Sequence, residues 1–534
     1  MPVATDRPGV VFLFAVVLGA VGVRPDQGSA AAPYQCGTRL VELLAAELPL
    51  PDPPLRAAKP AGSADARQDL PEIGVGTRQE FPVAGNPRLV QATCRYAGER
   101  VFVFVEDRQW DTNGGSILQS HVDVVADLFE RATPADPGRG IHDLCTEAFG
   151  AVPDVDGYPQ VFLLILDIPD SRLVGFFDAR VAGHEVPEMR RDILYVDEWY
   201  LRRQTYLARG TLAHEFQHLI HWGHDMDEEI WVNEGMSGYA EALTGFPEAD
   251  STVVGAFLRR PGAGLTAWEN RAWNYGSTYL FSAFLAERYG GDLIRAVVAE
   301  QENGIPGIDA AFAGLGLRGD FEEAWSGWIL GNYAAEGDEI TYGALRGRRA
   351  LWYPIDRLPL ESRMGSVEDR WGTIAILLRT PGSVQLEFAG KEEGRYRVWT
   401  RSMRGGGSEL RELELDASNR GSAIAAEIDS MALIVGRTST VNGEFEISAR
   451  HLQPVAARRT GVEATVLGDA VEGLTVEFSR AIAGRRRDYA WSAVTDAAGR
   501  VALTISSTDR VTGFYQARAL TSEGKVVGQW HSIP

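Results

Sequence analysis

The feature that most constrains the fold is a change of pattern near Trp352. Before it, residues 201–347 carry apolar side chains at helical spacing, as in TYLARGTLAHEFQHLIHW. After it come short runs of β-branched and aromatic residues, such as TIAILLRT and VQLEFAG, which Gly, Pro, Asp and Asn separate. The two patterns bury different faces of the backbone and therefore predict separate domains. We expect a multidomain protein in which a mixed α/β (α+β) domain precedes all-β modules.

The same patterns set the expected domain boundaries. The 534 residues are enough for three or four domains, each with a core of its own. Apolar runs predict strands at 101–107 and 160–168, and helical spacing predicts a helix at 117–132. We expect a mixed domain over 91–347, a β-sandwich module over 352–454 and an Ig-like β-module over 460–534.

The N-terminal end has the features of an exported chain. Residues 10–23 form an apolar run that is too short for a membrane helix but typical of a signal peptide. Small residues follow it, so we expect residues 1–31 to be a signal peptide and the protein to be secreted or extracytoplasmic, in the periplasm or at the cell surface. No later run approaches the ~18 apolar residues of a membrane span. Residues 32–90, rich in Pro, Ala, Gly and charge, indicate a linker or propeptide.

Charge and cysteine content limit the partners and the cross-links. Acidic residues number 73 against 52 basic ones, a net charge of -21, which argues against nucleic acid as a partner. Three cysteines are too few for a disulfide scaffold. We expect one disulfide, between Cys36 and Cys94, and one buried thiol, because Cys145 lies on what reads as the apolar face of a helix.

The segment HEFQH, residues 214–218, carries the chemistry. On a helix, side chains at i and i+4 share one face, so His214 and His218 can bind one zinc ion. Glu215 then flanks the metal. Zinc lowers the pKa of a bound water to about 7, and a neighbouring carboxylate can take the proton as that water attacks a carbonyl. The alternative is two surface histidines beside a solvated Glu.

Two acidic segments have features of calcium sites. DVDG at 154–157 resembles the start of a calcium loop, but the later Glu of such a loop is absent, so we expect a turn before a strand and no ion. Asp225, Asp227, Glu228 and Glu229 concentrate negative charge. A calcium (Ca2+) site is one interpretation of that run, and a solvated acidic loop is the commoner one.

Downstream of HEFQH lies WVNEGMSGYAE, residues 231–241. The combination of HExxH with NEGxxxYxE resembles the gluzincin metallopeptidases. Over about residues 95–345 the chain is most similar to the hyicolysin-type secreted neutral zinc metallopeptidases, and its WxNEG segment is also similar to the zinc aminopeptidases. The resemblance implies a zincin-like catalytic domain with one Zn2+ per chain. It implies these site residues: His214, His218 and Glu234 as zinc ligands, and Glu215 as general base.

A second ligand set remains open. His224 lies ten residues after His214, which is the spacing of the metzincin pattern HExxHxxGxxH. His221 stands where that pattern has its glycine, so the required chain reversal is less plausible. Glu234 is therefore favoured as the third ligand, with His224 as the alternative. We expect His221 to be hydrogen-bonded near the ligands or to lie at the surface.

Three further residues are candidates for supporting roles. Glu241 lies two helical turns after Glu234, where it can orient a ligand histidine or be exposed. Asn233 can cap a helix or contact substrate. Tyr275, in WNYGSTY, resembles the tyrosine with which gluzincins stabilise the oxyanion, and aromatic packing is the alternative.

Taken together, these features predict a secreted zinc-dependent endopeptidase that acts on protein or peptide substrates. The GxMEN segment of zinc aminopeptidases does not occur before residue 214, so cleavage within chains is favoured. The β-modules contain no visible catalytic set, and we expect them to bind substrate, a cell surface or the catalytic domain. The alternatives are a metzincin-like peptidase that uses His224 and a non-catalytic surface or adhesion protein with a zincin-like domain.

Overall fold

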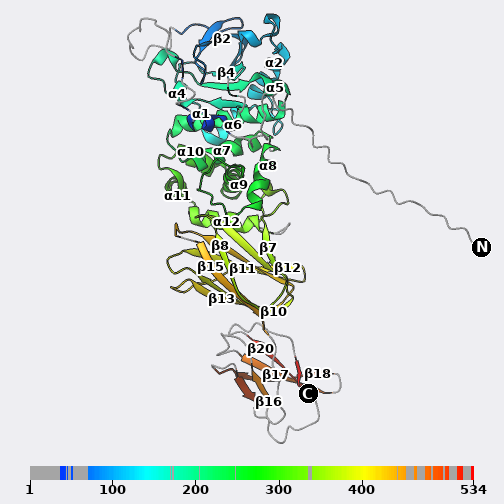
Figure 1. Ribbon diagram of the computed structural model, residues 1–534. Coiled ribbons are helices and arrows are strands. Elements are labelled where there is room, and N and C mark those ends of the chain that lie inside the picture. Colours follow the sequence, from blue (N-terminus) through cyan, green and yellow to red (C-terminus); the bar gives the residue numbers. More distant parts are fainter. Residues whose placement is uncertain are drawn as a thin grey trace, which may run out of the picture.

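The computed structural model describes the chain in segments. They are residues 36–43, 45, 50–51, 70–168, 170, 173–203, 205–246, 248–334, 340–441, 443–452, 462–465, 475–482, 485–496, 500–503, 514–520 and 531–533. The expected signal peptide, residues 1–31, lies outside them. Figure 1 shows the elements as successive layers, from a blue and cyan sheet through green helices and yellow sheets to orange and red strands.

The N-terminal layer is a six-stranded sheet in the order β1-β2-β3-β4-β6-β5. The strands are β1 (Arg78–Phe81), β2 (Val90–Ala97), β3 (Val101–Glu106), β4 (Val161–Leu166), β5 (Gly175–Phe177) and β6 (Ile193–Asp197). β3, β4 and β6 run parallel, and the other pairings are antiparallel. The parallel strands are buried on both faces, as their continuous apolar sequences require. β5 ends the order, so it is the edge strand beside which the candidate site is built.

Most of the helices pack on one face of this sheet or continue beyond it (Figure 1). The helices are α1 (Gly37–Leu43), α2 (Gln119–Glu130), α3 (Ile141–Phe149), α4 (Ala179–Ala182), α5 (Glu198–Arg203), α6 (Thr205–His224), α7 (Ile230–Leu243), α8 (Glu248–Arg259), α9 (Ala272–Tyr289), α10 (Gly291–Ala299), α11 (Gly304–Gly314) and α12 (Phe321–Asn332). Val41 of α1 and Val181 of α4 pack with the residues of the other face. The strands expected at 101–107 and 160–168 and the helix expected at 117–132 are confirmed as β3, β4 and α2. Within the described residues, no helix is long and apolar enough to cross a membrane.

Two sheets follow the helices. The first has the order β13-β10-β15-β8 and the second the order β12-β11-β14-β9-β7. Their strands are β7 (Trp352–Ile355), β8 (Leu360–Val367), β9 (Thr373–Leu378), β10 (Gly382–Gly390), β11 (Tyr396–Arg404), β12 (Gly407–Glu412), β13 (Arg420–Ile428), β14 (Ser430–Arg437) and β15 (Gly443–His451). Alternate residues of both sheets meet in one hydrophobic cluster. The change of pattern near Trp352 therefore marks a real structural boundary, and the chain combines helices with several sheets.

Six strands are described in the last part of the chain. They are β16 (Val462–Thr465), β17 (Thr475–Ile482), β18 (Arg485–Val494), β19 (Arg500–Leu503), β20 (Phe514–Leu520) and β21 (His531–Ile533). β16 pairs with β19, and the other four form a sheet in the order β18-β17-β20-β21. All of these pairings are antiparallel.

Tryptophans join the helices to the five-stranded sheet. Trp325 of α12 donates a hydrogen bond from its indole nitrogen to Trp371 O, 3.0 Å away, and the two rings meet edge to face. Trp399 of β11 belongs to the same buried cluster. The outer face of this sheet is therefore part of the helical core.

The linker or propeptide expected over residues 32–90 stays a prediction, but parts of that range pack against the sheet. Residues 78–81 form β1, which pairs with β2, and Phe81 and Val83 are fully buried against the sheet. Val41 of α1 joins the same cluster. The sequence did not indicate these elements because a strand of four residues and a helix of two turns are too short to show a hydrophobic period.

The expected Cys36–Cys94 disulfide is also wrong, because all three cysteines are free and buried. Cys94 lies on β2, near one edge of the sheet, and its thiol donates to Tyr96 O at 3.2 Å. Cys36 precedes α1, which packs on β5 at the opposite edge. Cys145 is buried on α3, as expected.

The DVDG segment forms a bend before β4, as expected. Asp154 and Asp156 converge there with Asp192 in a group that could hold a metal ion, so the expectation of no ion stays a prediction. Asp156 Oδ1 accepts a hydrogen bond from Tyr158 N at 3.0 Å, which closes the bend. Asp192 lies beside it, and its backbone N–H donates to Asp156 Oδ2 at 3.4 Å. Burial first, and then the charge of Asp156, raises the pKa of the Asp192 carboxyl from 3.8 to about 8.

This raised pKa predicts how stability depends on pH. The unfolded chain releases the Asp192 proton near its ordinary pKa of 3.8, whereas the folded chain keeps it up to about pH 8. The contribution of Asp192 to stability is therefore highest below the first value and falls as the pH rises to the second. In Asp192→Asn this titration is lost, so we expect the thermal midpoint to fall less across that range. Circular dichroism melts check this, with the exposed Asp123→Asn as control. Identical pH profiles for wild type and Asp192→Asn would contradict it.

Candidate metal centre

Helices α6 and α7 bring three predicted ligands together. His214 and His218 share one face of α6, with their ring centroids 4.9 Å apart. Glu234 of α7 lies opposite them. Its Oε2 is 3.4 Å from His214 Nε2 and 4.0 Å from His218 Nε2.

The position of Glu234 depends on close packing of α7 against α9. Gly235 follows the glutamate, and a Cβ at this position would lie 2.7 Å from Ser282 Oγ and 2.9 Å from Thr278 O. Only a residue without a side chain fits there. The glycine of the NEG segment therefore lets the two helices approach and holds the glutamate at the histidines.

A fourth donor, which the sequence analysis missed, completes the group. Cys36 Sγ lies 3.2 Å from His218 Nε2. One donor atom from each of Cys36, His214, His218 and Glu234 lies within 4.8 Å of the others, and all four side chains are buried. The sequence held little signal for this contact, because Cys36 is 182 residues from His218 and lies in a stretch with linker composition.

The donor set fits a zinc ion. Zinc takes four ligands from Cys sulfur, His nitrogen and carboxylate oxygen at about 2.0–2.3 Å, which separates tetrahedral neighbours by about 3.3–3.8 Å. The separations of 3.2, 3.4 and 4.0 Å among these donors are close to that range. A buried Cys/His/His/Glu group of this size can hold a metal ion.

Neighbouring side chains orient the two imidazoles. His214 Nδ1 donates a hydrogen bond to Glu241 Oε1 at 2.8 Å, and His218 Nδ1 donates to Asn233 Oδ1 at 2.8 Å. These bonds leave both Nε2 atoms facing Glu234. Of the two roles considered for Glu241, the structure favours orientation of a ligand histidine. Asn233 does the same for His218.

Protonation of the group suits metal binding. Burial lowers the pKa of His218 to about 4, so its imidazole is neutral at neutral pH. Burial opposes ionisation of Glu234, but contact with the histidines, the hydrogen bond from His214 foremost, outweighs it and lowers the Glu234 pKa. Burial, and then the charges of Glu234 and Glu215, raise the pKa of the Cys36 thiol well above its ordinary value. A divalent cation would relieve this repulsion.

Glu215 lies beside the group and faces β5. Its Oε2 accepts a hydrogen bond from Phe177 N at 3.2 Å and a short one from the Thr38 hydroxyl. The side chain is buried, and burial is the main reason that its pKa rises to about 7. A carboxyl group with this pKa can accept and release a proton near neutral pH.

Tyr275 of α9 reaches the same place. Its hydroxyl donates to Asn270 Oδ1 at 2.6 Å and accepts from Cys36 N at 3.3 Å. The ring also packs edge to face on Trp268. Tyr275 is therefore both an aromatic packing residue and a hydroxyl next to the donor group. Tyr279, one turn later, is in the core.

The structure does not bring His224 to the group. Its Nε2 donates to Ala151 O at 3.1 Å, and a Cβ at Gly150 would lie 2.6 Å from that nitrogen. His221 is fully buried, and its Nδ1 lies 3.2 Å from Gln217 Nε2. The expectation that His221 is hydrogen-bonded near the ligands is confirmed, and the surface alternative is wrong.

The acidic run after α6 is only partly a solvated loop. Asp225 and Glu228 are buried, and Glu228 Oε1 accepts a hydrogen bond from Gly304 N at 2.8 Å, at the first residue of α11. Glu229 accepts from the Trp231 indole at 2.6 Å. In the described part of the chain, the run does not form a cluster of three or more converging donors. These carboxylates instead stabilise local structure.

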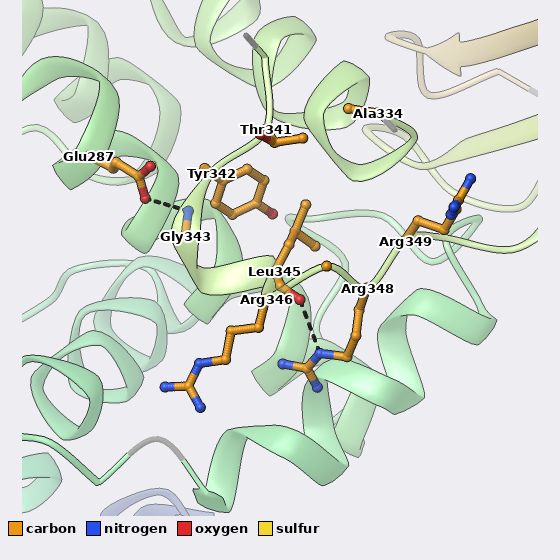
Figure 2. Close-up of a pocket in the computed structure, with 10 residues that line it drawn as sticks. Glu287, Ala334, Thr341, Tyr342, Gly343, Leu345, Arg346, Arg348 and Arg349 are labelled. Atoms are coloured by element: carbon orange, nitrogen blue, oxygen red, sulfur yellow. Dashed lines mark hydrogen bonds between the residues drawn. The ribbon is translucent and has the colours of Figure 1, made fainter. Parts of the chain in front are cut away.

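A separate hollow of about 210 Å³ lies between α9 and the segment after α12. Figure 2 shows Glu287 at its edge, where Oε2 accepts a hydrogen bond from Gly343 N at 2.7 Å. Tyr342 and Arg348 also line it. None of its lining residues belongs to the donor group, so the candidate metal centre lies elsewhere.

Comparison with known proteins assigns the chain to no family. No family model matches it, and no curated protein does. One solved structure that is similar is the pre-peptidase C-terminal domain of collagenase from Bacillus anthracis, with 12% identity, a TM-score of 0.16, and coverage of 19% of this chain and 98% of that one. Another is a family GH115 4-O-methyl-alpha-glucuronidase, with 8% identity, a TM-score of 0.13, and coverage of 55% and 51%. Both TM-scores are too low to support an inference.

Exchanging the third ligand tests the group directly. We expect Glu234→Gln to lose zinc at neutral pH, because the amide has no charge to offset the metal, and His224→Ala to keep it. Zinc content after dialysis, with far-UV circular dichroism as a check of folding, measures both. Release of zinc by His224→Ala with retention by Glu234→Gln would contradict this ligand set.

The residue that orients His214 should tune affinity. We expect Glu241→Gln to weaken zinc binding about 10–100-fold, because the amide no longer holds the imidazole through a charged hydrogen bond. Glu229→Gln makes the same exchange at the start of α7, where the carboxylate contacts Trp231, and should leave affinity unchanged. Competition against a chelating dye gives both values. Equal affinity for the two variants would exclude the orienting role.

Proposed function

We propose that the chain is a secreted zinc endopeptidase with a zincin-like catalytic domain of gluzincin type, followed by a β-sandwich and an Ig-like β-module. One observation carries the proposal. Two imidazoles and the Glu234 carboxylate converge while Glu215, the carboxyl between the two histidines in sequence, lies beside them with its pKa raised to about 7. A purely structural metal site has no need of such a carboxyl.

In this proposal, His214, His218 and Glu234 hold the zinc. Zinc held there would polarise the substrate carbonyl and acidify the attacking water. Glu215 takes the proton of that water and passes it to the leaving amine. Phe177 N of β5 and the Thr38 hydroxyl of α1 hold the Glu215 carboxyl in place beside the group.

The oxyanion requires a hydrogen-bond donor as charge develops. The Tyr275 hydroxyl, which is buried and lies 3.3 Å from Cys36 N, is the candidate on this side of the group. If the Tyr275 hydroxyl donated to the oxyanion instead of to Asn270 Oδ1, a neutral hydrogen-bond donor would lie next to the reacting carbonyl.

Strand β5 offers a surface for an extended peptide. It is an edge strand, and the Phe177 N–H donates to the Thr38 hydroxyl at 2.8 Å rather than to another strand. Edge strands bind extended chains through main-chain hydrogen bonds. This arrangement favours cleavage within protein or peptide chains. We infer that the C-terminal β-modules bind substrate, a cell surface or the catalytic domain.

One observation favours a second candidate, a non-catalytic protein with a structural metal. Structural zinc sites have four protein ligands, and with Cys36 the group has four donors. In that case Cys36 is required for folding and Glu215 has no catalytic task.

Casein hydrolysis by variants that lack the Cys36 thiol distinguishes the peptidase from the protein with a structural metal. We compare Cys36→Ala with the double variant Cys36→Ala, Glu215→Gln. We expect each to hold one zinc per chain and only the first to cleave casein, with the loss in the second about 10²–10⁴-fold because a positioned base is removed. Zinc content and casein hydrolysis are the measurements. Equal hydrolysis by both, or a zinc-loaded Cys36→Ala that does not cleave, would contradict the peptidase.

A further inference from the structure

We propose that residues 36–43, Cys36 together with α1, form an inhibitory segment that keeps the peptidase latent, with the Cys36 thiolate as the fourth ligand of the metal. The inference rests on the proposed function and adds how the same site is regulated. Figure 1 shows α1 beside α6, and α1 also contacts β5.

The thiol occupies the position that catalysis needs. A catalytic zinc site has three protein ligands and keeps its fourth position for water or substrate. Cys36 Sγ is within the same 4.8 Å group as the ligands, and the side chain is 1% exposed. A thiolate bound there excludes water from the metal. The proton that the thiol loses on binding passes to solvent.

The next residues engage the other parts of the proposed machinery. Thr38 donates a short hydrogen bond to the proposed base, Glu215, and also accepts from Phe177 N at 2.8 Å. The backbone N–H of Cys36 donates to the Tyr275 hydroxyl at 3.3 Å. One short segment therefore contacts the ligand group, the base, the oxyanion donor and the edge strand.

The segment is fitted closely to β5. A Cβ at Gly37 would lie 1.6 Å from Gly175 O, so no other residue can bring the chain this near to the strand. Val41, 1% exposed, anchors the far end of α1 in the core beside Phe176. An extended substrate cannot pair with β5 while this segment is present.

Cobalt tests the thiol ligand without reference to activity. The full chain loaded with Co2+ should show a near-ultraviolet thiolate-to-cobalt charge-transfer band. Cys36→Ala should lack the band, and Cys94→Ala, which removes a buried thiol outside the group, should keep it. Absence of the band from the wild type, or its persistence in Cys36→Ala, would overturn thiol ligation.

Zinc-loaded protein tests inhibition. We expect Cys36→Ala to cleave casein at least about tenfold faster than the wild type, because an intramolecular ligand acts at high effective concentration. Gly37→Ala keeps the thiol but displaces the segment, and should also be faster than wild type. If Cys36→Ala loses zinc and unfolds, the site is structural and the inference is overturned. If Cys36→Ala cleaves at the wild-type rate, the inference fails while the proposed function stands.

A synthetic peptide with the sequence of the segment gives an independent test of inhibition. The peptide YQCGTRLVEL, residues 34–43, should inhibit Cys36→Ala. The same peptide with Ser in place of its Cys, and a scrambled peptide that keeps the Cys, should be at least about tenfold weaker, since one lacks the ligand and the other the fit to β5. Equal inhibition by the scrambled peptide would show a general thiol effect and contradict a dedicated segment.

Discussion

The structure of the site depends on the burial of four polar side chains in one small group. Two imidazoles, a carboxylate and a thiol lie within 4.8 Å of one another in a region from which solvent is excluded. Burying such groups costs free energy unless hydrogen bonds or a cation compensate them. The hydrogen bonds from His214 to Glu241 and from His218 to Asn233 compensate one side of each ring. A metal ion bound among the four donors would offset the remaining cost.

Helix packing provides this arrangement. α6 carries two donors on one face, α7 supplies the third, and α9 lies close enough to fix α7 because Gly235 has no side chain. The sheet contributes its edge strand β5, whose Phe177 N–H reaches Glu215. Each contact joins two neighbouring elements, and together the contacts connect the sheet to three helices. The site is therefore a product of the tertiary fold rather than of one motif.

Sequence reasoning could predict the parts that local periodicity encodes. The HEFQH and WVNEGMSGYAE segments are long helical patterns, and their ligand residues follow from spacing and from resemblance. The role of Cys36 could not be predicted in this way, because no periodicity links it to His218 over 182 residues. The expected Cys36–Cys94 disulfide is wrong for a related reason. The number of cysteines does not indicate near which edge of the sheet each one lies. β1 was missed because four residues between turns carry no period.

The central claim is that zinc binds to this donor group, and X-ray absorption at the zinc edge tests it most directly. For the full chain loaded with one equivalent of Zn2+, the account predicts four ligands, namely two imidazole nitrogens, one oxygen and one sulfur at about 2.3 Å. In Cys36→Ala the sulfur shell should be replaced by oxygen while both imidazoles remain. A spectrum without imidazole scattering, or six oxygen ligands in both proteins, would contradict the account.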